Sequence, residues 1–228
     1  MANKKKGLET RKHIVETATR LFYERGMDSV SVKDICDEAG IPKSLFYYYY
    51  EDKLELATLM WRAFLKEAYK AASDNGRYSA LSEDAESRTI FYDAAYLSLL
   101  KDKQLLKVYS DAIYAMPKFW FSGNGISFGA SAYQGRSRGM ERKDFDMLSS
   151  FLGVFPLMVK RLLEIGDSEV TPEEFVIYFQ FLSHSYFERD TGKILETVTR
   201  QVEIASENLI DLSAIFLRIP ELMFPEQP

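Results

Sequence analysis

Seven residues between positions 42 and 53 carry side chains that can contact a DNA duplex: Pro42, Lys43, Ser44, Leu45, Tyr47, Tyr48 and Lys53. A lysine can donate to guanine acceptors in the major groove, a serine can pair with several bases, and a leucine can touch a thymine methyl. Tyrosine hydroxyls and a further lysine can reach phosphate oxygens, which fixes register without reading sequence. These residue types in one short segment indicate a nucleic-acid contact surface.

The run from Tyr47 to Tyr50 tests that interpretation, because an aromatic stripe is often part of a core. Successive residues of a helix are turned by about 100°, so four consecutive tyrosines cannot all face one side. At least two must point away from the core, beside Lys43. The sequence therefore favours an exposed aromatic and basic face.

Two short helices around a tight turn would position this face. Ser31 followed by Asp34 is a capping-box pattern that starts one helix, and Gly40 is placed to end it. Pro42 suits the first turn of the next helix, which we expect over 43–50. This is the arrangement of a helix-turn-helix, whose second helix enters the major groove of DNA.

Apolar residues fill the predicted angle between these two helices: Ile35, Ala39, Ile41, Phe46 and Tyr49. Cys36 is the small residue where the helices would touch. Its thiol could act as a redox sensor, but without a basic neighbour on its face we interpret it as inert packing.

Helices are also predicted on both sides of this motif. Apolar residues recur at the spacing of one helical face over about 10–25, and Gly26 then stands where a left-handed residue often ends a helix. After the motif, Asp52 caps a fourth helix with Glu55 at its third position.

The run from Gly40 to Lys53 resembles the turn, recognition helix and following cap of the TetR (tetracycline-repressor) family. That family typically shows a glycine, an aliphatic residue, a Ser/Pro/Thr position, a basic residue, an aromatic cluster and a closing lysine. The runs 21–26 and 31–35 are similar to its first helix and to the start of its second. The resemblance covers about 8–62, roughly a quarter of the chain.

The resemblance implies an all-α protein, with an N-terminal three-helix helix-turn-helix domain followed by a larger helical-bundle domain for ligand sensing and dimerisation. It implies a cytoplasmic homodimer that acts as a ligand-released repressor on a palindromic operator. By position, Ser31, Tyr47 and Lys53 would contact phosphate. The residues at or near bases would be Lys33, Lys43, Ser44, Leu45 and Tyr48. Tyr50 stands where the family often has Phe, so its hydroxyl would want a partner or solvent.

Charge is distributed unevenly along a chain whose net charge is −5. Residues 1–62 hold 11 Lys and Arg against 10 Asp and Glu, whereas residues 63–228 hold 18 against 24. The run Lys4–Lys6 could simply be a solvated tail, but a polyanion would contact this basic end rather than the acidic remainder. We therefore predict two domains: 1–62 binds DNA, and 63–228 senses a ligand and dimerises.

The rest of the chain also has helical patterns, near 83–102, 104–115, 141–165, 172–188 and 193–219. Thr171 and Glu174 frame a clear start for the fourth of these, and Pro156 should kink the third. Residues 117–140 are irregular and have no predicted structure. The sequence contains no predicted membrane span or secretory signal, and its single cysteine fits a reducing cytoplasm.

Aromatic residues are dense between about 90 and 160, where ordinary core packing is the default interpretation. Some could instead line a cavity, because ligand pockets between helices are mostly apolar with a few polar groups. The pattern does not separate these alternatives. We expect a small apolar or aromatic effector, and a cationic one would suit the acidic domain. The candidate contacts are Tyr92, Tyr96, Tyr109, Tyr114, Trp120, Phe151 and Phe155.

The last predicted helix carries apolar residues at alternating spacings of 3 and 4, which is the seam of a helix packed lengthwise against a partner. The preceding helix repeats these spacings, so two helices from each chain could form a four-helix bundle. The predicted dimer interface contains Phe175, Phe179, Leu182, Tyr186, Val198, Val202, Ala205, Leu209, Leu212 and Phe216. The alternative is that both stripes face the core of their own chain.

Catalytic and metal sites find little support in the sequence. His13 and His184 are the two histidines, far apart and without ligand-spaced partners, and no nucleophile motif or phosphate-binding glycine loop is present. We therefore expect no metal, no cofactor and no enzymatic activity. The remaining rival function is a helical protein–protein adaptor that does not bind DNA and docks through 117–140.

Overall fold

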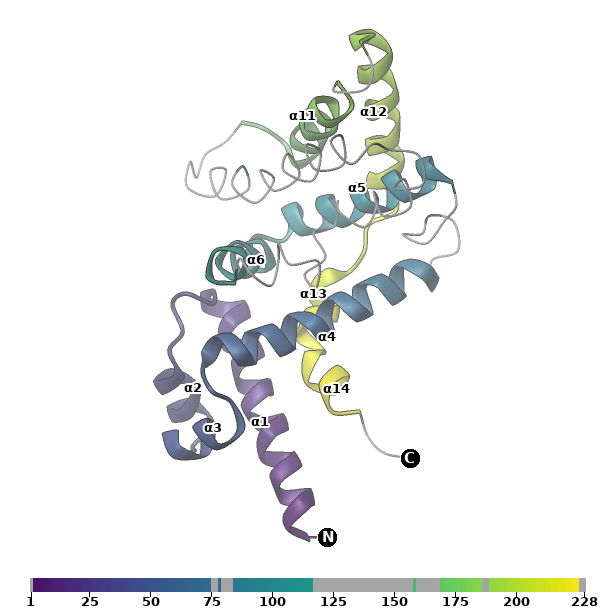
Figure 1. Ribbon diagram of the computed structural model, residues 1–228. Helices are drawn as coiled ribbons and strands as arrows, with labels where there is room; N and C mark the ends of the chain where they lie inside the picture. The colour runs from purple at the N-terminus through teal and green to yellow at the C-terminus, as the bar shows by residue number, and fades with distance from the viewer. Residues whose placement is uncertain are drawn as a thin grey trace, which may run out of the picture. The chain divides into compact units, whose positions relative to one another are not determined.

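The computed structural model describes residues 2–74, 78, 84–116, 158, 169–185 and 189–225. The elements in these ranges are α-helices, which agrees with the predicted all-α class (Figure 1). They divide into two compact units, which we describe separately. Unit 1 contains Met1–Ala68, Lys103–Phe119 and Leu212–Pro228, and unit 2 contains Tyr69–Asp102 and Trp120–Asp211.

Unit 1 is organised around its first helix. Its helices are α1 (Ala2–Arg25), α2 (Val32–Glu38), α3 (Lys43–Tyr49), most of α4 (Lys53–Asp74), α6 (Lys103–Ala115), α13 (Leu212–Leu217) and α14 (Ile219–Met223). The first helix, α1, packs against α2, α6, α13 and α14. Its predicted apolar face is buried, with Ile14, Ala18 and Leu21 fully enclosed. The helix ends at Gly26, whose φ of 81° is the left-handed conformation expected there.

Unit 2 contains α5 (Ala85–Lys101), α11 (Pro172–His184) and α12 (Thr191–Ser206), and each of these helices packs against the other two. The capping box predicted at Thr171 is present, because the Glu174 amide donates to the Thr171 hydroxyl and the Glu174 carboxylate accepts from the Thr171 amide. A hydroxyl at this position satisfies an amide that the helix itself leaves unpaired. The start of α11 is therefore set by its local sequence.

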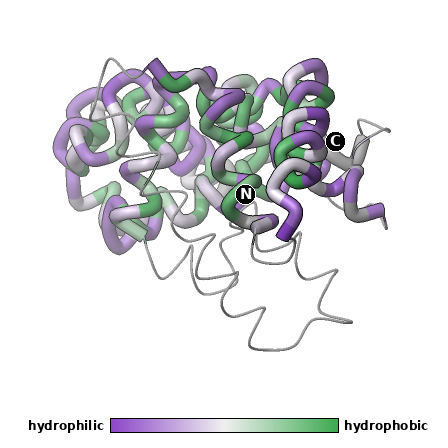
Figure 2. Tube along the Cα trace, turned by 90° about the horizontal axis from the view of Figure 1, so that it is seen from above, coloured by the Kyte–Doolittle hydropathy of each residue, from purple (hydrophilic) through white to green (hydrophobic). Residues whose placement is uncertain are grey.

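The helices bury one side and expose the other. Hydrophobic and hydrophilic residues alternate along the coloured tube in Figure 2, as amphipathic helices require. In α6, for example, Leu105, Val108 and Ala112 are buried, whereas Lys107 is exposed. No helix of the described ranges has the length and the apolar character needed to cross a membrane.

The prediction of one helix over 193–219 is wrong. Helix α12 ends at Ser206, and α13 begins only at Leu212. The Asn208 side chain donates to the Ile204 carbonyl, and the Ile210 amide donates to the Ser98 hydroxyl of α5, so polar partners satisfy the backbone where the helix stops. The alternating 3 and 4 spacing continues across this break, because each piece needs its own apolar face.

The compact unit around the helix-turn-helix is larger than the predicted N-terminal domain. It includes α6, α13 and α14, which lie far beyond residue 62 in the sequence. The predicted division into a DNA-binding domain, 1–62, and a ligand-sensing and dimerisation domain, 63–228, stays a prediction.

Candidate nucleic-acid interface

The start of α2 is fixed by the predicted capping box. The Asp34 amide donates to the Ser31 hydroxyl at 3.2 Å, and the Ser31 amide donates to the Asp34 carboxylate at 2.8 Å. These bonds to Ser31 lower the pKa of Asp34. The Ser31 hydroxyl itself donates to the same carboxylate, so the predicted phosphate contact by Ser31 would have to replace that bond.

The turn between α2 and α3 follows the expected chemistry. Gly40 has a φ of 63°, a left-handed conformation that residues with a Cβ adopt only at a cost. The amide of Ile41 donates to the Cys36 carbonyl at 3.0 Å, which closes the turn. Cys36 is buried, and burial raises the pKa of its thiol, which is consistent with its interpretation as packing.

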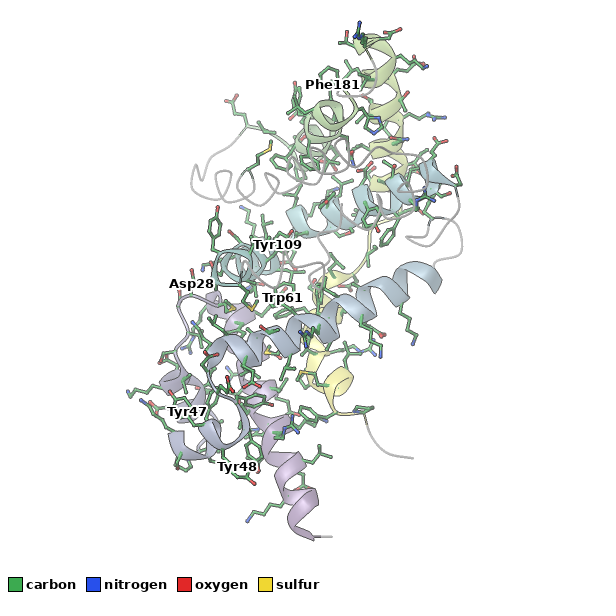
Figure 3. All side chains as sticks on the ribbon, viewed as in Figure 1. Asp28, Tyr47, Tyr48, Trp61, Tyr109 and Phe181 are labelled. Atoms are coloured by element: carbon green, nitrogen blue, oxygen red, sulfur yellow. The ribbon has the colours of Figure 1, made fainter. Side chains whose placement is uncertain are left out.

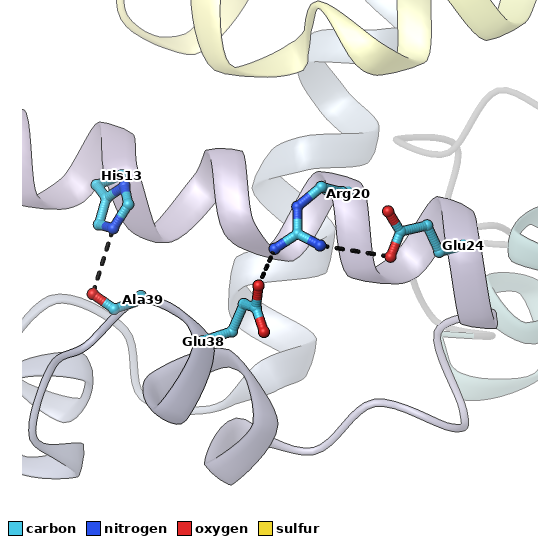
Figure 4. A network of polar contacts seen from close by, with 5 residues as sticks. All are labelled: His13, Arg20, Glu24, Glu38 and Ala39. Atoms are coloured by element: carbon cyan, nitrogen blue, oxygen red, sulfur yellow. Dashed lines mark hydrogen bonds and ion pairs between the residues drawn. The ribbon is translucent and has the colours of Figure 1, made fainter.

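Polar contacts from α1 hold this turn from the outside (Figure 4). His13 Nε2 lies 3.2 Å from the carbonyl oxygen of Ala39, the residue that caps α2 just before Gly40. About two turns further along α1, the Arg20 guanidinium pairs with Glu38 at the end of α2 and with Glu24 of its own helix. All three of these charged side chains are almost half exposed, so each ion pair adds little to the free energy of folding. The pair with Glu38 serves mainly to orient α2 against α1. The sequence pattern did not reveal the contacts of His13 with Ala39 and of Arg20 with Glu38, because they join residues 26 and 18 positions apart.

Helix α3 is buried on one side and exposed to solvent on the other. Phe46 and the following Tyr50 are buried at 0% and 1% exposure, and their rings contact each other. Tyr47 and Tyr48 are 54% and 77% exposed (Figure 3). The prediction that at least two of the four tyrosines point away from the core is therefore confirmed.

The exposed side of α3 also carries most of the remaining predicted DNA contacts. Pro42, Lys43 and Ser44 are exposed, and Leu45 is half-buried. On α2, Lys33 is exposed and pairs with Asp37 at 3.3 Å, an ion pair that water screens. The arrangement offers hydrogen-bond donors and the apolar Leu45 side chain on a short helix whose opposite side is buried in the core of unit 1. DNA contact by these residues stays a prediction.

Lys53 has a partner that the sequence pattern did not reveal. Its Nζ donates to the carbonyl oxygens of Met27 at 2.9 Å and Val30 at 2.8 Å, in the loop between α1 and α2. An ammonium group has three donors, so one N–H is left for the predicted phosphate contact. Lys53 thus ties the start of α4 to the loop that precedes α2.

The predicted effector contacts lie in different parts of the molecule. Tyr92 and Tyr96 are buried in unit 2, and the Tyr96 ring packs against Phe179. Tyr109 is buried in unit 1 beside Trp61, as Figure 3 shows, whereas Tyr114 is 39% exposed. Three further candidates, Trp120, Phe151 and Phe155, lie outside the described residues. A ligand role for any of them stays a prediction.

Most of the predicted dimer seam is buried within this chain. In unit 2 the buried members are Phe175, Phe179, Val198, Val202 and Ala205, and in unit 1 they are Leu212 and Phe216. Leu182 and Leu209 remain 47% and 42% exposed. Tyr186 lies outside the described residues. The alternative that these stripes face their own core therefore describes most of them.

Acidic and histidine clusters suited to a metal are absent from the described part of the chain. Among the described residues of unit 2, one acid is buried. Asp93 of α5 is fully buried and accepts a hydrogen bond from Gln180 of α11, while its Oδ2 has no hydrogen-bond partner. Burial raises the pKa of this carboxyl to about 8. No spacing or motif in the sequence singles out this residue.

Comparison with known proteins agrees with the geometry of α1 to α4. Residues 14–59 match the family model of bacterial regulatory proteins, tetR family. The HTH-type transcriptional regulator AcrR of Shigella flexneri is 36% identical over 58 residues, 25% of this chain and 27% of that protein. A probable acrEF/envCD operon repressor of Escherichia coli (strain K12) is 28% identical over 86 residues, 35% of this chain and 39% of that protein.

These matches span about a quarter to two fifths of the length of the curated relatives. Among solved structures, a gamma-butyrolactone receptor (ArpA-like protein) aligns with a TM-score of 0.45 at 16% identity, over 87% of this chain and 98% of that one. The segment that matches the family model, 14–59, contains the capping box of α2, the Gly40 turn and the exposed face of α3. Over residues 14–59, the N-terminal helix-turn-helix of this chain is similar to the tetR family of bacterial regulatory proteins.

Proposed function

We propose that this chain is a transcriptional repressor that binds duplex DNA through the exposed face of α3. The observation that supports the proposal is the contrast in exposure between the side chains of this one helix. Phe46 is fully buried, whereas Lys43, Ser44 and Tyr48 are exposed beside it. A recognition helix needs both a rigid anchor and free side chains that reach base edges.

The working form in this proposal is a homodimer, because two-fold symmetry pairs two recognition helices on the half-sites of a palindrome. Support comes from apolar residues that the chain leaves exposed in unit 2. Tyr178 and Leu182 lie one turn apart on α11 at 60% and 47% exposure, and Leu195 on α12 is 47% exposed. These residues replace the continuous seam predicted from the sequence as the candidate interface.

A small effector releases the DNA in this proposal. It binds better to a form in which the two recognition helices are wrongly spaced, and so shifts the population away from DNA. Asp93 supports an effector with a hydrogen-bond acceptor, because its carboxyl keeps a proton below about pH 8 and the buried Oδ2, which has no partner, would gain from an acceptor. The neighbouring rings of Tyr92 and Tyr96 supply apolar surface on the same helix.

Selection from a pool of genomic fragments tests the DNA-binding proposal. The protein is mixed with the fragments at moderate salt, bound duplexes are recovered and sequenced, and the selection is repeated with Tyr48→Ala. We expect enrichment of one palindrome by the wild-type protein, less enrichment by the variant, and weaker binding as salt rises. Recovery of unenriched fragments, or of none, would instead favour the adaptor function.

A further inference from the structure

The C-terminal helices of this chain are part of the unit that carries the helix-turn-helix. Helices α13 and α14 contribute Leu212, Ile215, Phe216, Ile219 and Pro220 to the buried core. Both helices pack against α1. A segment from the far end of the sequence therefore completes the apolar core of the unit that contains the helix-turn-helix.

Phe216 is the centre of this packing. Its ring centroid lies 6.2 Å from that of Tyr23 on α1, and 5.7 Å and 5.8 Å from those of Trp61 and Phe64 on α4. Aromatic pairs at these separations are favourable beyond the area that they bury. Phe216 thus joins α13 to both of the long helices that flank the helix-turn-helix.

A second contact reaches the recognition helix itself. Beyond α14, the Phe224 ring lies 5.5 Å from the Arg11 guanidinium, which in turn lies 6.0 Å from the ring of Tyr50. Tyr50 caps the C-terminal end of α3 and is 1% exposed. Arg11 Nε is buried without a hydrogen-bond partner, whereas Arg11 interacts with the Tyr50 hydroxyl and so opposes the burial that raises the pKa of Tyr50. The two rings and this hydroxyl are therefore described neighbours that favour the guanidinium at this place.

We propose that Phe224 is a positioning residue for α3, and that it acts through Arg11 and Tyr50. This inference rests on the proposed DNA binding by α3. The Arg11 guanidinium lies over the Phe224 ring at 5.5 Å, so the ring limits where Arg11 lies. The position of Arg11 then limits where the end of α3 lies. Contacts with base edges demand close geometry, whereas phosphate contacts tolerate displacement.

We therefore expect a loss of affinity for the palindrome that is not matched by a loss of affinity for other duplexes. Phe224→Ala should weaken binding to the selected palindrome by about tenfold, as expected for a partly desolvated cation–π contact. Binding to a scrambled duplex should change by less than about twofold, and the salt slope should stay as in the wild-type protein, because the phosphate contacts are kept. Phe224→Tyr keeps the ring and should restore the selective affinity.

The experiment measures dissociation constants for both duplexes by fluorescence anisotropy, using the full chain. Leu217→Ala is the matched control, because Leu217 lies on α13 and is 47% exposed; it should bind as the wild-type protein does. Thermal unfolding identifies any variant that loses its fold. If Phe224→Ala unfolds, Arg11→Gln provides the same test, because it removes the cation that lies over both rings and keeps a polar side chain.

The outcomes separate the inference from the function on which it rests. Equal affinity of folded Phe224→Ala and the wild-type protein for the palindrome would overturn the positioning role. So would an equal loss on both duplexes, or a loss that Phe224→Tyr does not restore. If the wild-type protein itself fails to distinguish the two duplexes, the proposed DNA-binding function fails instead.

Discussion

The ammonium nitrogen of Lys53 lies 2.8 Å from the main-chain oxygen of Val30, the residue that precedes the Ser31 cap of α2. Together with the bond to Met27, this contact makes Lys53 a tie between the start of α4 and the loop before the helix-turn-helix. A residue predicted to touch phosphate thus also has a structural function within its own chain.

Replacement of this lysine should therefore affect both stability and binding. Lys53→Ala leaves two carbonyl oxygens without a charged donor, so the free energy of unfolding should fall by about 1–3 kcal/mol. Urea unfolding measures this change, and Lys33→Ala, at an exposed position on α2, is the control and should have little effect. A phosphate contact alone would give normal stability and a salt slope lower by about one unit.

Two glycines with left-handed backbones should respond differently to alanine. A Cβ added at Gly40 would meet no atom within 4 Å, so Gly40→Ala should cost only the backbone strain of about 1–2 kcal/mol. At Gly26 the same carbon would collide with Lys107 and Asp111. The Asp111 carboxylate accepts a hydrogen bond from the Asp28 amide at 3.1 Å, and moving the carboxylate aside would break this bond. Gly26→Ala should therefore destabilise unit 1 more than Gly40→Ala. Equal unfolding midpoints for the two variants would contradict this reasoning.

These residues show what sequence could and could not predict. The starts of α2 and α11 depend on residues three positions apart, Ser31 with Asp34 and Thr171 with Glu174, and both capping boxes were predicted correctly. The split of α3 into buried and exposed tyrosines followed from helical geometry alone. Local spacing was sufficient in these cases because the interacting groups are close in the chain.

Contacts between distant segments were not predictable in the same way. The bonds from Lys53 to Met27 and Val30 depend on how α4 packs, and nothing in the spacing marks them. The predicted helix over 193–219 was wrong because an alternating apolar pattern is the same for one long helix and for two helices that face different cores. Phe216 belongs to such a second core, and only packing reveals it.

Asp93 gives unit 2 a pH dependence that can be measured. Its pKa is about 8 in the folded chain and about 4 in an unfolded one, so the folded chain holds a proton that the unfolded chain releases between these values. Stability should be highest near pH 4 on this account, and it should fall as pH rises toward 8. Asp93→Asn should reduce this fall.

Urea unfolding midpoints between pH 5 and pH 9 test this dependence. The difference in midpoint between Asp93→Asn and the wild-type protein should grow as pH rises and level off above about pH 8. Glu203→Gln is the control, since Glu203 is exposed on α12 and its loss should leave the wild-type profile unchanged. A difference between Asp93→Asn and wild type that is constant with pH would show that Asp93 is already ionised in the folded chain.

The proposed dimer can be separated from the cores of the two units. Tyr178→Glu with Leu182→Glu places charges on the exposed side of α11 and should convert a dimer to a folded monomer of 26.3 kDa. Phe216→Glu should instead unfold unit 1, because that ring is 1% exposed. Light scattering gives the mass, with Leu217→Glu on α13 as the exposed control. A double variant that stays dimeric places the interface elsewhere.

If the exposed face of α3 reads DNA sequence, as proposed, Lys43 should discriminate between bases. The measurement is the affinity of Lys43→Ala and wild-type protein for the selected palindrome and for variants with each base pair changed. Loss of one lysine–base contact should weaken binding to the palindrome by about 1–3 kcal/mol and relax discrimination at one position of each half-site. A uniform loss at all positions, or unchanged discrimination, would contradict sequence reading by α3.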